Sequence, residues 1–226
     1  MPMPDQPIAS VAQKSPIQSK HALWAVFGLM ALFVLFTRER SLLDPSSFLR
    51  QRYAPVPWLM FLHGIPAALA LALGVFQFSS RLRQRHLQAH RVMGRIYVAS
   101  AVIGALVAIV VAIKLPIPSL FMASLIQSGG WLITTGTALY CVRQGKIQQH
   151  KEWMMRGYPF AMVFIVNRVI LSIPAVQGMG VFGLITVVWS TLALACFLPS
   201  SVIAWQALAA SNNAGKKAAG AQKTAG

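Results

Sequence analysis

Two segments of the chain combine histidine, basic and aromatic residues in a pattern that could bind a cofactor. The segment AHRVMGRIY covers residues 89–97, and the segment QHKEWMMRGY covers residues 149–158. Each stands at the start of a strongly apolar stretch, and each offers one imidazole, that of His90 or His150. Two imidazoles on facing helices can hold haem iron inside a helical bundle. The two segments therefore predict a site for haem b whose iron is bound by His90 and His150.

The other polar residues of these segments suit the same site. If the helices extend inward, towards the cytoplasm, beyond the apolar stretches, the spacing i, i+4, i+7 places His90, Gly94 and Tyr97 on one face. A glycine beside a histidine leaves room for a flat ligand or for a close helix. The haem propionates would be held by guanidinium groups, namely those of Arg91, Arg95 and Arg156. The same residue types also form the belt that contacts lipid headgroups, so both interpretations, haem b and no cofactor, stay open.

A second group of polar residues lies within the apolar stretches themselves. At 1.5 Å per residue, His63 lies about 10 Å from one edge of its stretch, Gln127 about 12 Å and Arg168 about 8 Å. Asn167 precedes Arg168 directly. If successive stretches run in alternating directions, these four side chains share one layer in the outer half of the membrane.

Three explanations of this layer are open. The four side chains could form a hydrogen-bonded network that determines helix packing. They could line a ligand pocket that faces the outer side. Alternatively, Arg168 could extend alone towards the membrane surface. A charged arginine at the membrane centre costs about 2.5 kcal/mol or more, and these stretches contain no carboxylate, so Arg168 requires neutral acceptors, water or an anionic ligand.

Composition indicates the kind of protein that positions these residues. The chain has 226 residues, 56% of them hydrophobic, and only four are acidic. Its mean hydropathy is +0.61, which is typical of an integral membrane protein. The net charge of +16 therefore favours anionic lipid headgroups as partners over nucleic acid, which would need a soluble basic domain. The two cysteines, Cys141 and Cys196, are too few and too far apart for a disulfide framework or a metal site.

The apolar stretches predict an all-α integral membrane protein with six transmembrane helices. Spans two to five carry the polar residues described above and are expected to form a four-helix core. Residues 1–20 and 207–226 are polar, and we expect two disordered cytoplasmic tails. The expected spans are residues 22–36, 56–78, 96–114, 119–142, 157–173 and 181–206.

The distribution of basic residues predicts the orientation. Arginine and lysine gather at residues 81–91, at 143–156 and near both termini. Basic residues accumulate on the cytoplasmic side of membrane proteins. An even number of spans with both termini in the cytoplasm places these clusters inside, and the expected location is the bacterial cytoplasmic (inner) membrane.

Two functions fit these residues, and a third cannot be distinguished from them. There is no acidic pair in the spans, no phosphate-binding glycine loop and no Ser-His-Asp set, which argues against a hydrolase or a transferase. The first hypothesis is a b-type haem electron-transfer protein that exchanges electrons with a quinone or another redox partner. The alternative is a non-enzymatic transporter or small-ligand carrier that uses His63, Gln127, Asn167 and Arg168. A structural partner subunit would also fit.

Three motifs within residues 56–175 carry a resemblance to a known family. They are H…G-x-x-Q-F…R…H-R-x-x-G-R-x-Y, then H-x-x-W-M-x-R, then N-R. Together they resemble a bacterial membrane family catalogued as domain of unknown function 2306. The residues that match are His63, Gly74, Gln77, Phe78, Arg81, His90, Arg91, Gly94, Arg95, Tyr97, His150, Trp153, Met154, Arg156, Asn167 and Arg168.

A weaker resemblance is to two-haem cytochromes of the b-561 type. That family has six spans, with haem ligands paired between spans two and four and between spans three and five. His90 and His150 match the second pair by span. Span four, however, has Gln127 and no histidine, so the resemblance implies one bis-histidine haem at most.

Overall fold

A computed structural model describes residues 16–37, 43–46, 50–51, 53–114 and 117–224, with side chains between residues 25 and 212. All the regular structure in these ranges is helical, which confirms the predicted all-α class. Most of the expected N-terminal tail, residues 1–15, lies outside the described residues. The helices are α1 (Pro16–Thr37), α3 (Pro57–Gln77), α4 (Ser80–Arg85), α5 (Leu87–Lys114), α6 (Pro118–Arg143), α7 (Ile147–Ile170), α8 (Pro174–Gly178) and α9 (Gly180–Thr224).

Local sequence signals explain where several helices begin. Proline, whose fixed φ suits a first helical residue, starts α3, α6 and α8. The short helix α4 is capped by Ser79, whose side-chain oxygen accepts a hydrogen bond of 3.2 Å from the Leu82 amide. Gly145, with a φ of 71°, makes the turn from α6 to α7. This backbone conformation favours glycine.

Among the described residues, six long helices overlap the six predicted spans, and α1, α5 and α7 begin at least six residues earlier than expected. Helix α5 begins at Leu87 where the span was expected at residue 96, and α7 begins at Ile147 where 157 was expected. The basic residues in these turns mark the edge of the membrane, and an edge need not end a helix. At 28 residues α5 is about 42 Å long, which exceeds a hydrocarbon core of about 30 Å.

Helical structure extends into both segments where tails were expected, residues 1–20 and 207–226. Helix α9 continues without a break to Thr224. The segment is polar, but it is rich in alanine and contains three lysines, residue types that favour helix. Likewise α1 begins at Pro16, within the predicted N-terminal tail.

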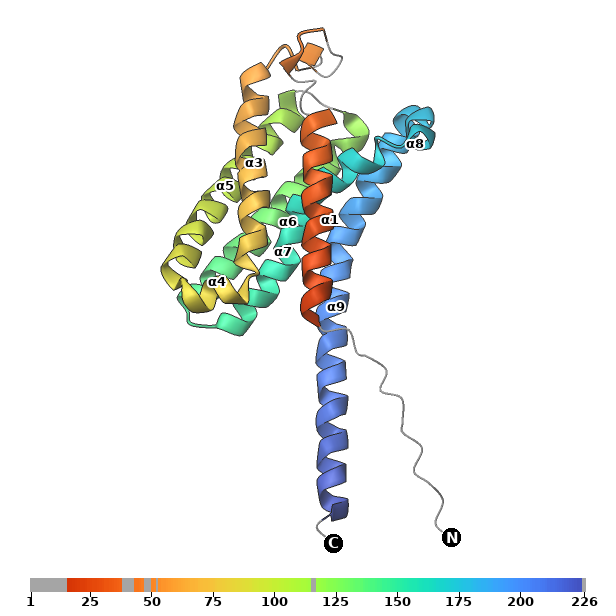
Figure 1. Ribbon diagram of the computed structural model, residues 1–226. Helices are drawn as coiled ribbons and strands as arrows, with labels where there is room; N and C mark the ends of the chain where they lie inside the picture. Colours follow the sequence, from red (N-terminus) through yellow and green to blue (C-terminus); the bar gives the residue numbers. More distant parts are fainter. Residues whose placement is uncertain (1–15, 38–42, 47–49, 52, 115–116, 225–226) are drawn as a thin grey trace.

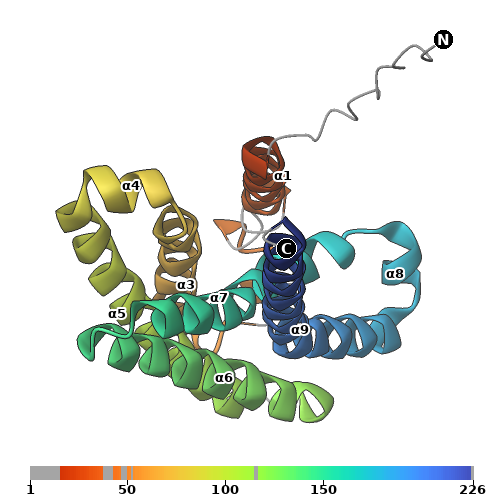
Figure 2. The ribbon, with the colours of Figure 1, turned by 90° about the horizontal axis from the view of Figure 1, so that it is seen from below.

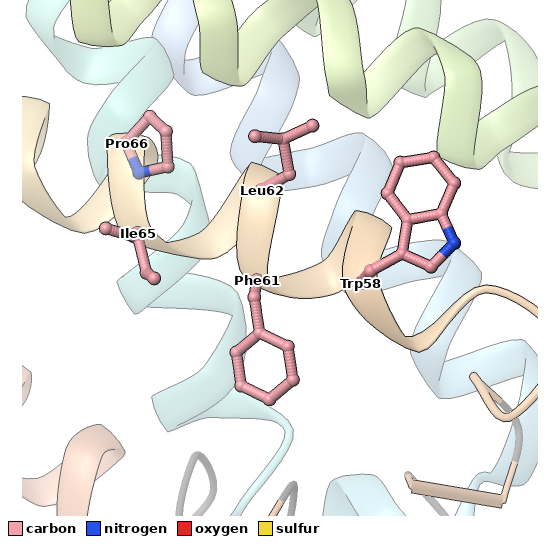
Figure 3. Close-up of a pocket in the computed structure, with 5 residues that line it drawn as sticks. All are labelled: Trp58, Phe61, Leu62, Ile65 and Pro66. Atoms are coloured by element: carbon pink, nitrogen blue, oxygen red, sulfur yellow. The ribbon is translucent and has the colours of Figure 1, made fainter.

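Exposed apolar surface shows how the bundle meets lipid. Within the part of the chain that the structure describes, three helical segments are long and apolar enough to cross a membrane, Pro57–Gln77, Leu87–Lys114 and Gly180–Asn212, and Ala25–Thr37 is a shorter apolar helix. A shallow apolar groove of about 430 Å³ lies along α3 (Figure 3). Its five lining residues are Trp58, Phe61, Leu62, Ile65 and Pro66. An exposed surface of this kind is expected on an integral membrane protein.

The long helices run side by side, and α7 is the central one (Figures 1 and 2). It packs against α1, α3, α6 and α9. Helix α4 and the turn between α6 and α7 lie at one end of the bundle, called here the α4 end, and α8 lies at the opposite α8 end. The first residues of α1 and the last of α9 are both on the side of the α4 end, as an even number of spans requires.

The hydrophobic core extends beyond the predicted four helices. Besides side chains from α3, α5, α6 and α7, it includes Leu192 and Ala195 of α9. The closest approach is at Gly74 of α3, where an added Cβ would overlap the ring of Tyr158. That ring is held in place because its hydroxyl donates a 2.8 Å hydrogen bond to the Leu71 carbonyl.

Candidate functional site

A cavity of about 1210 Å³ opens between α3, α5, α6, α7 and α9 towards the α8 end. All four residues of the predicted polar layer line it, namely His63, Gln127, Asn167 and Arg168. They meet because α3 and α6 begin at this end whereas α7 finishes there. Alternating helix direction thus brings residues that are distant in sequence to one cavity.

His63 links two helices at the side of the cavity. Its Nδ1 lies 2.9 Å from the carbonyl oxygen of Gly104 on α5. A carbonyl can only accept, so Nδ1 carries the hydrogen and Nε2 is the acceptor nitrogen of the neutral ring. The hydrogen bond therefore determines both the tautomer and the orientation of the imidazole.

Gln127 and Asn167 are held in the same manner by neighbouring helices. The Gln127 amide nitrogen donates to the Phe160 carbonyl on α7 at 3.1 Å. The Asn167 carbonyl oxygen accepts from the hydroxyl of Thr191 on α9 at 2.6 Å. Each bond uses one end of a side-chain amide, which leaves the Gln127 oxygen and the Asn167 nitrogen with hydrogen-bonding capacity.

Arg168 brings positive charge to the cavity. Its guanidinium carbon lies 4.9 Å above the centre of the Phe164 ring, a favourable cation–π contact. Arg168 stands two residues before the end of α7 at Ile170, so it is about 3 Å from the helix end. This shallow depth lowers the cost of the charge.

Two of the three explanations of the polar layer, a network that determines helix packing and a ligand pocket, are both supported by the geometry. His63, Gln127 and Asn167 each bind an adjacent helix and so contribute to packing. The same residues border a cavity, which is the arrangement expected of a pocket.

At the α4 end the two predicted haem ligands come near each other: His90 of α5 lies in the neighbourhood of His150, Arg83 and Arg91. The His150 Nδ1 donates to the Ala138 carbonyl at 2.8 Å, so Nε2 is the nitrogen that could bind a metal. The Nδ1 of His90 is buried without a hydrogen-bond partner among the described residues.

The glycines beside these histidines serve close packing. A Cβ on Gly157 would lie 2.8 Å from the Thr134 hydroxyl oxygen, and one on Gly94 would lie 3.2 Å from the Gln77 side-chain oxygen. Both spaces are therefore filled by neighbouring side chains. A glycine beside a histidine was expected to leave room either for a flat ligand or for a close helix. At Gly94 and Gly157 the space is taken by a neighbouring helix.

The other residues that were predicted to contact haem do not come together at one place in the structure. Tyr97 is 1% exposed, in the core, and its hydroxyl accepts a 3.3 Å hydrogen bond from the Trp131 indole. Arg156 lies 3.8 Å from the Glu152 carboxylate and 5.1 Å from the Trp153 ring centre. Arg91 and Arg95 are exposed. Among the described residues no group of three or more histidine, cysteine or acidic side chains could hold a metal ion.

Sequence reasoning missed residues that support or line the cavity. Thr191 holds Asn167, and Trp131 and Phe164 belong to the cavity wall. A buried hydroxyl within the sixth apolar span, Thr191, was a visible signal. Nothing in the residue types alone distinguishes Trp131 or Phe164 from ordinary core residues.

Comparison with known proteins supports the stronger of the two resemblances. A family model described as "Predicted membrane protein (DUF2306)" matches residues 60–208, which is about two thirds of the chain. Searches of the curated proteins and of the solved structures found no match. The resemblance to b-561 cytochromes thus stays a prediction. The matched region contains every described residue that lines the cavity except Tyr53, and the chain belongs to this DUF2306 family of predicted membrane proteins.

Proposed function

We propose that this membrane protein is a non-enzymatic carrier that binds a small anionic ligand in the cavity at the α8 end. The observation that carries the proposal is the convergence of His63, Gln127, Asn167 and Arg168 on one cavity of about 1210 Å³. Ligand sites combine apolar walls with a few well-placed polar groups, and this cavity has that composition.

Charge and rigidity support an anion as the ligand. Arg168 is the charged residue among the described residues that line the cavity, so its field attracts negative charge. The hydrogen bonds to Phe160 and Thr191 hold Gln127 and Asn167 in place. Polar groups that are already ordered lose less entropy when a ligand binds.

Ligand-induced thermal stabilisation tests the proposal. Purified protein is heated with chloride, acetate or phosphate, and its melting temperature is recorded. A ligand at a hundred times its Kd stabilises the folded state by about 2.7 kcal/mol, so at least one anion raises the melting temperature of the wild type. Arg168→Gln abolishes this shift. The matched control is Arg143→Gln at the opposite end of the bundle, which retains it. A wild type that no anion stabilises contradicts the proposal.

A second candidate function is electron transfer through haem b between His90 and His150. The closeness of His150 to His90 and the anchored Nδ1 of His150 favour it. When bound, haem supplies one-electron chemistry, and His90 and His150 would hold its iron. Against it stand the filled spaces beside Gly94 and Gly157, so the cavity is the better supported site.

An absorption spectrum decides between the two functions. The protein is produced with added haem. A b-type Soret band that is present in the wild type and absent in His90→Ala supports electron transfer. His86→Ala is the matched control, because His86 lies one turn away and is exposed, and it keeps the band. A colourless preparation under the same conditions rejects the haem.

A further inference from the structure

The cavity has one wall made of small and branched apolar residues. This wall belongs to α5, and its members recur at spacings of three and four residues, which places them on one helix face. Small side chains leave volume next to the helix that larger ones would fill. The residues of this wall are Gly104, Ala105, Ala108, Val111 and Ala112.

Charge and apolar space are separated along the axis of the bundle. Arg168 is about 3 Å from the end of α7, whereas Trp131 is thirteen residues into α6, about 20 Å from the same end of the bundle. Both line the cavity. The cavity therefore reaches about 17 Å inward from its cation, along the apolar wall of α5.

The size of the cavity exceeds the needs of an inorganic anion. At about 1210 Å³ it is larger than pockets of roughly 300–1,000 Å³ that hold drug-sized ligands. An anion bound by Arg168 would leave most of this volume for an attached apolar group. Leu184 and Val188 of α9 add to the apolar lining of the cavity.

From this arrangement, which rests on the proposed function, we infer that the ligand is a single-chain carboxylate amphiphile. Its carboxylate pairs with Arg168, and its alkyl chain lies along the α5 wall towards Trp131. One cation matches one negative charge, and a guanidinium presents two parallel donors that fit a carboxylate. The amide nitrogen of Asn167 adds a further donor, because Thr191 occupies only the amide oxygen.

The test compares octanoate with acetate, and octanoate is used below its critical micelle concentration. The measured quantity is the Kd obtained from thermal stabilisation of the detergent-purified protein. Each buried methylene contributes about 0.8 kcal/mol, roughly a fourfold gain in affinity, so octanoate is expected to bind at least about tenfold more tightly than acetate. Octyl phosphate, with the same chain and more charge, is expected to bind no more tightly than octanoate.

A large side chain in the α5 wall tests the site of the ligand's alkyl chain separately from the site of its carboxylate. Ala108→Phe places a ring in the apolar part of the cavity, so octanoate loses its advantage while acetate binds as before. The matched control is Val110→Phe on the exposed side of α5, which leaves both affinities unchanged. Ala112→Phe repeats the test one turn further along, and it replaces Ala108→Phe if that variant does not fold.

The outcomes distinguish this inference from the proposed function. Equal binding of acetate and octanoate by the wild type overturns the amphiphile while leaving an anion site in place. Tighter binding of octyl phosphate overturns the carboxylate. An octanoate advantage that survives both Ala108→Phe and Ala112→Phe places the chain elsewhere and also overturns the inference. A failure of every anion to bind overturns the proposed function itself.

Discussion

Replacing Gly74 with alanine tests the contact between α3 and the Tyr158 ring of α7. A Cβ at this position would overlap the Tyr158 ring, so the ring must move. Overpacking of this kind costs about 1–3 kcal/mol. Movement of the ring also weakens the 2.8 Å hydrogen bond from its hydroxyl to Leu71, a loss of about 1 kcal/mol. Alanine returns about 1 kcal/mol of helix propensity, so the expected net loss is about 1–3 kcal/mol.

Gly64→Ala provides the matched control on the same helix. No atom lies within 4 Å of a Cβ at Gly64, so this variant gains the propensity term of up to about 1 kcal/mol without a clash. The two variants are therefore expected to differ by about 2–4 kcal/mol. The free energy of unfolding is measured by equilibrium denaturation in mixed detergent micelles, and equal stability of the two variants would refute the packing described here.

Two further predictions concern the support of the cavity and the orientation of the chain. Thr191→Val removes the 2.6 Å hydrogen bond to Asn167 and is expected to lower stability by about 1 kcal/mol and to weaken anion binding; unchanged octanoate affinity and stability would show that Thr191 does not support the site. In a cysteine-free background, Gln84→Cys in α4 and Ala175→Cys in α8 are expected to react with a membrane-impermeant thiol reagent from opposite sides of the membrane, and the cytoplasmic side is expected for Gln84→Cys. Labelling of both from one side would exclude the predicted topology.

Much of the fold followed from the apolar pattern, because burial in lipid requires long helices. Helices α3 and α6 differ by one residue at each end from the predicted spans. The starts of α5 and α7 were missed because basic residues show where the membrane ends, while helical hydrogen bonding continues beyond it. The helical end of α9 was missed because polarity was given more weight than the helix propensity of alanine.

The candidate site was predictable in part for a similar reason. Depth along alternating helices placed His63, Gln127 and Arg168 in one layer, since rise per residue is constant. Depth does not give the direction of a side chain around its helix. Tyr97 was therefore expected beside a cofactor, whereas it lies in the core and binds Trp131. The sequence of one helix does not reveal which neighbouring helix its polar side chains face.

His63 and His150 share an arrangement with a consequence for how the helices are joined. Each gives its Nδ1 hydrogen to a main-chain oxygen of the adjacent helix. The acceptors are carbonyl groups of the backbone, so they are present whatever side chain occupies residue 104 or residue 138. The two imidazoles therefore join α3 to α5 near one end of the bundle and α7 to α6 near the other without requiring a particular side chain on the partner helix.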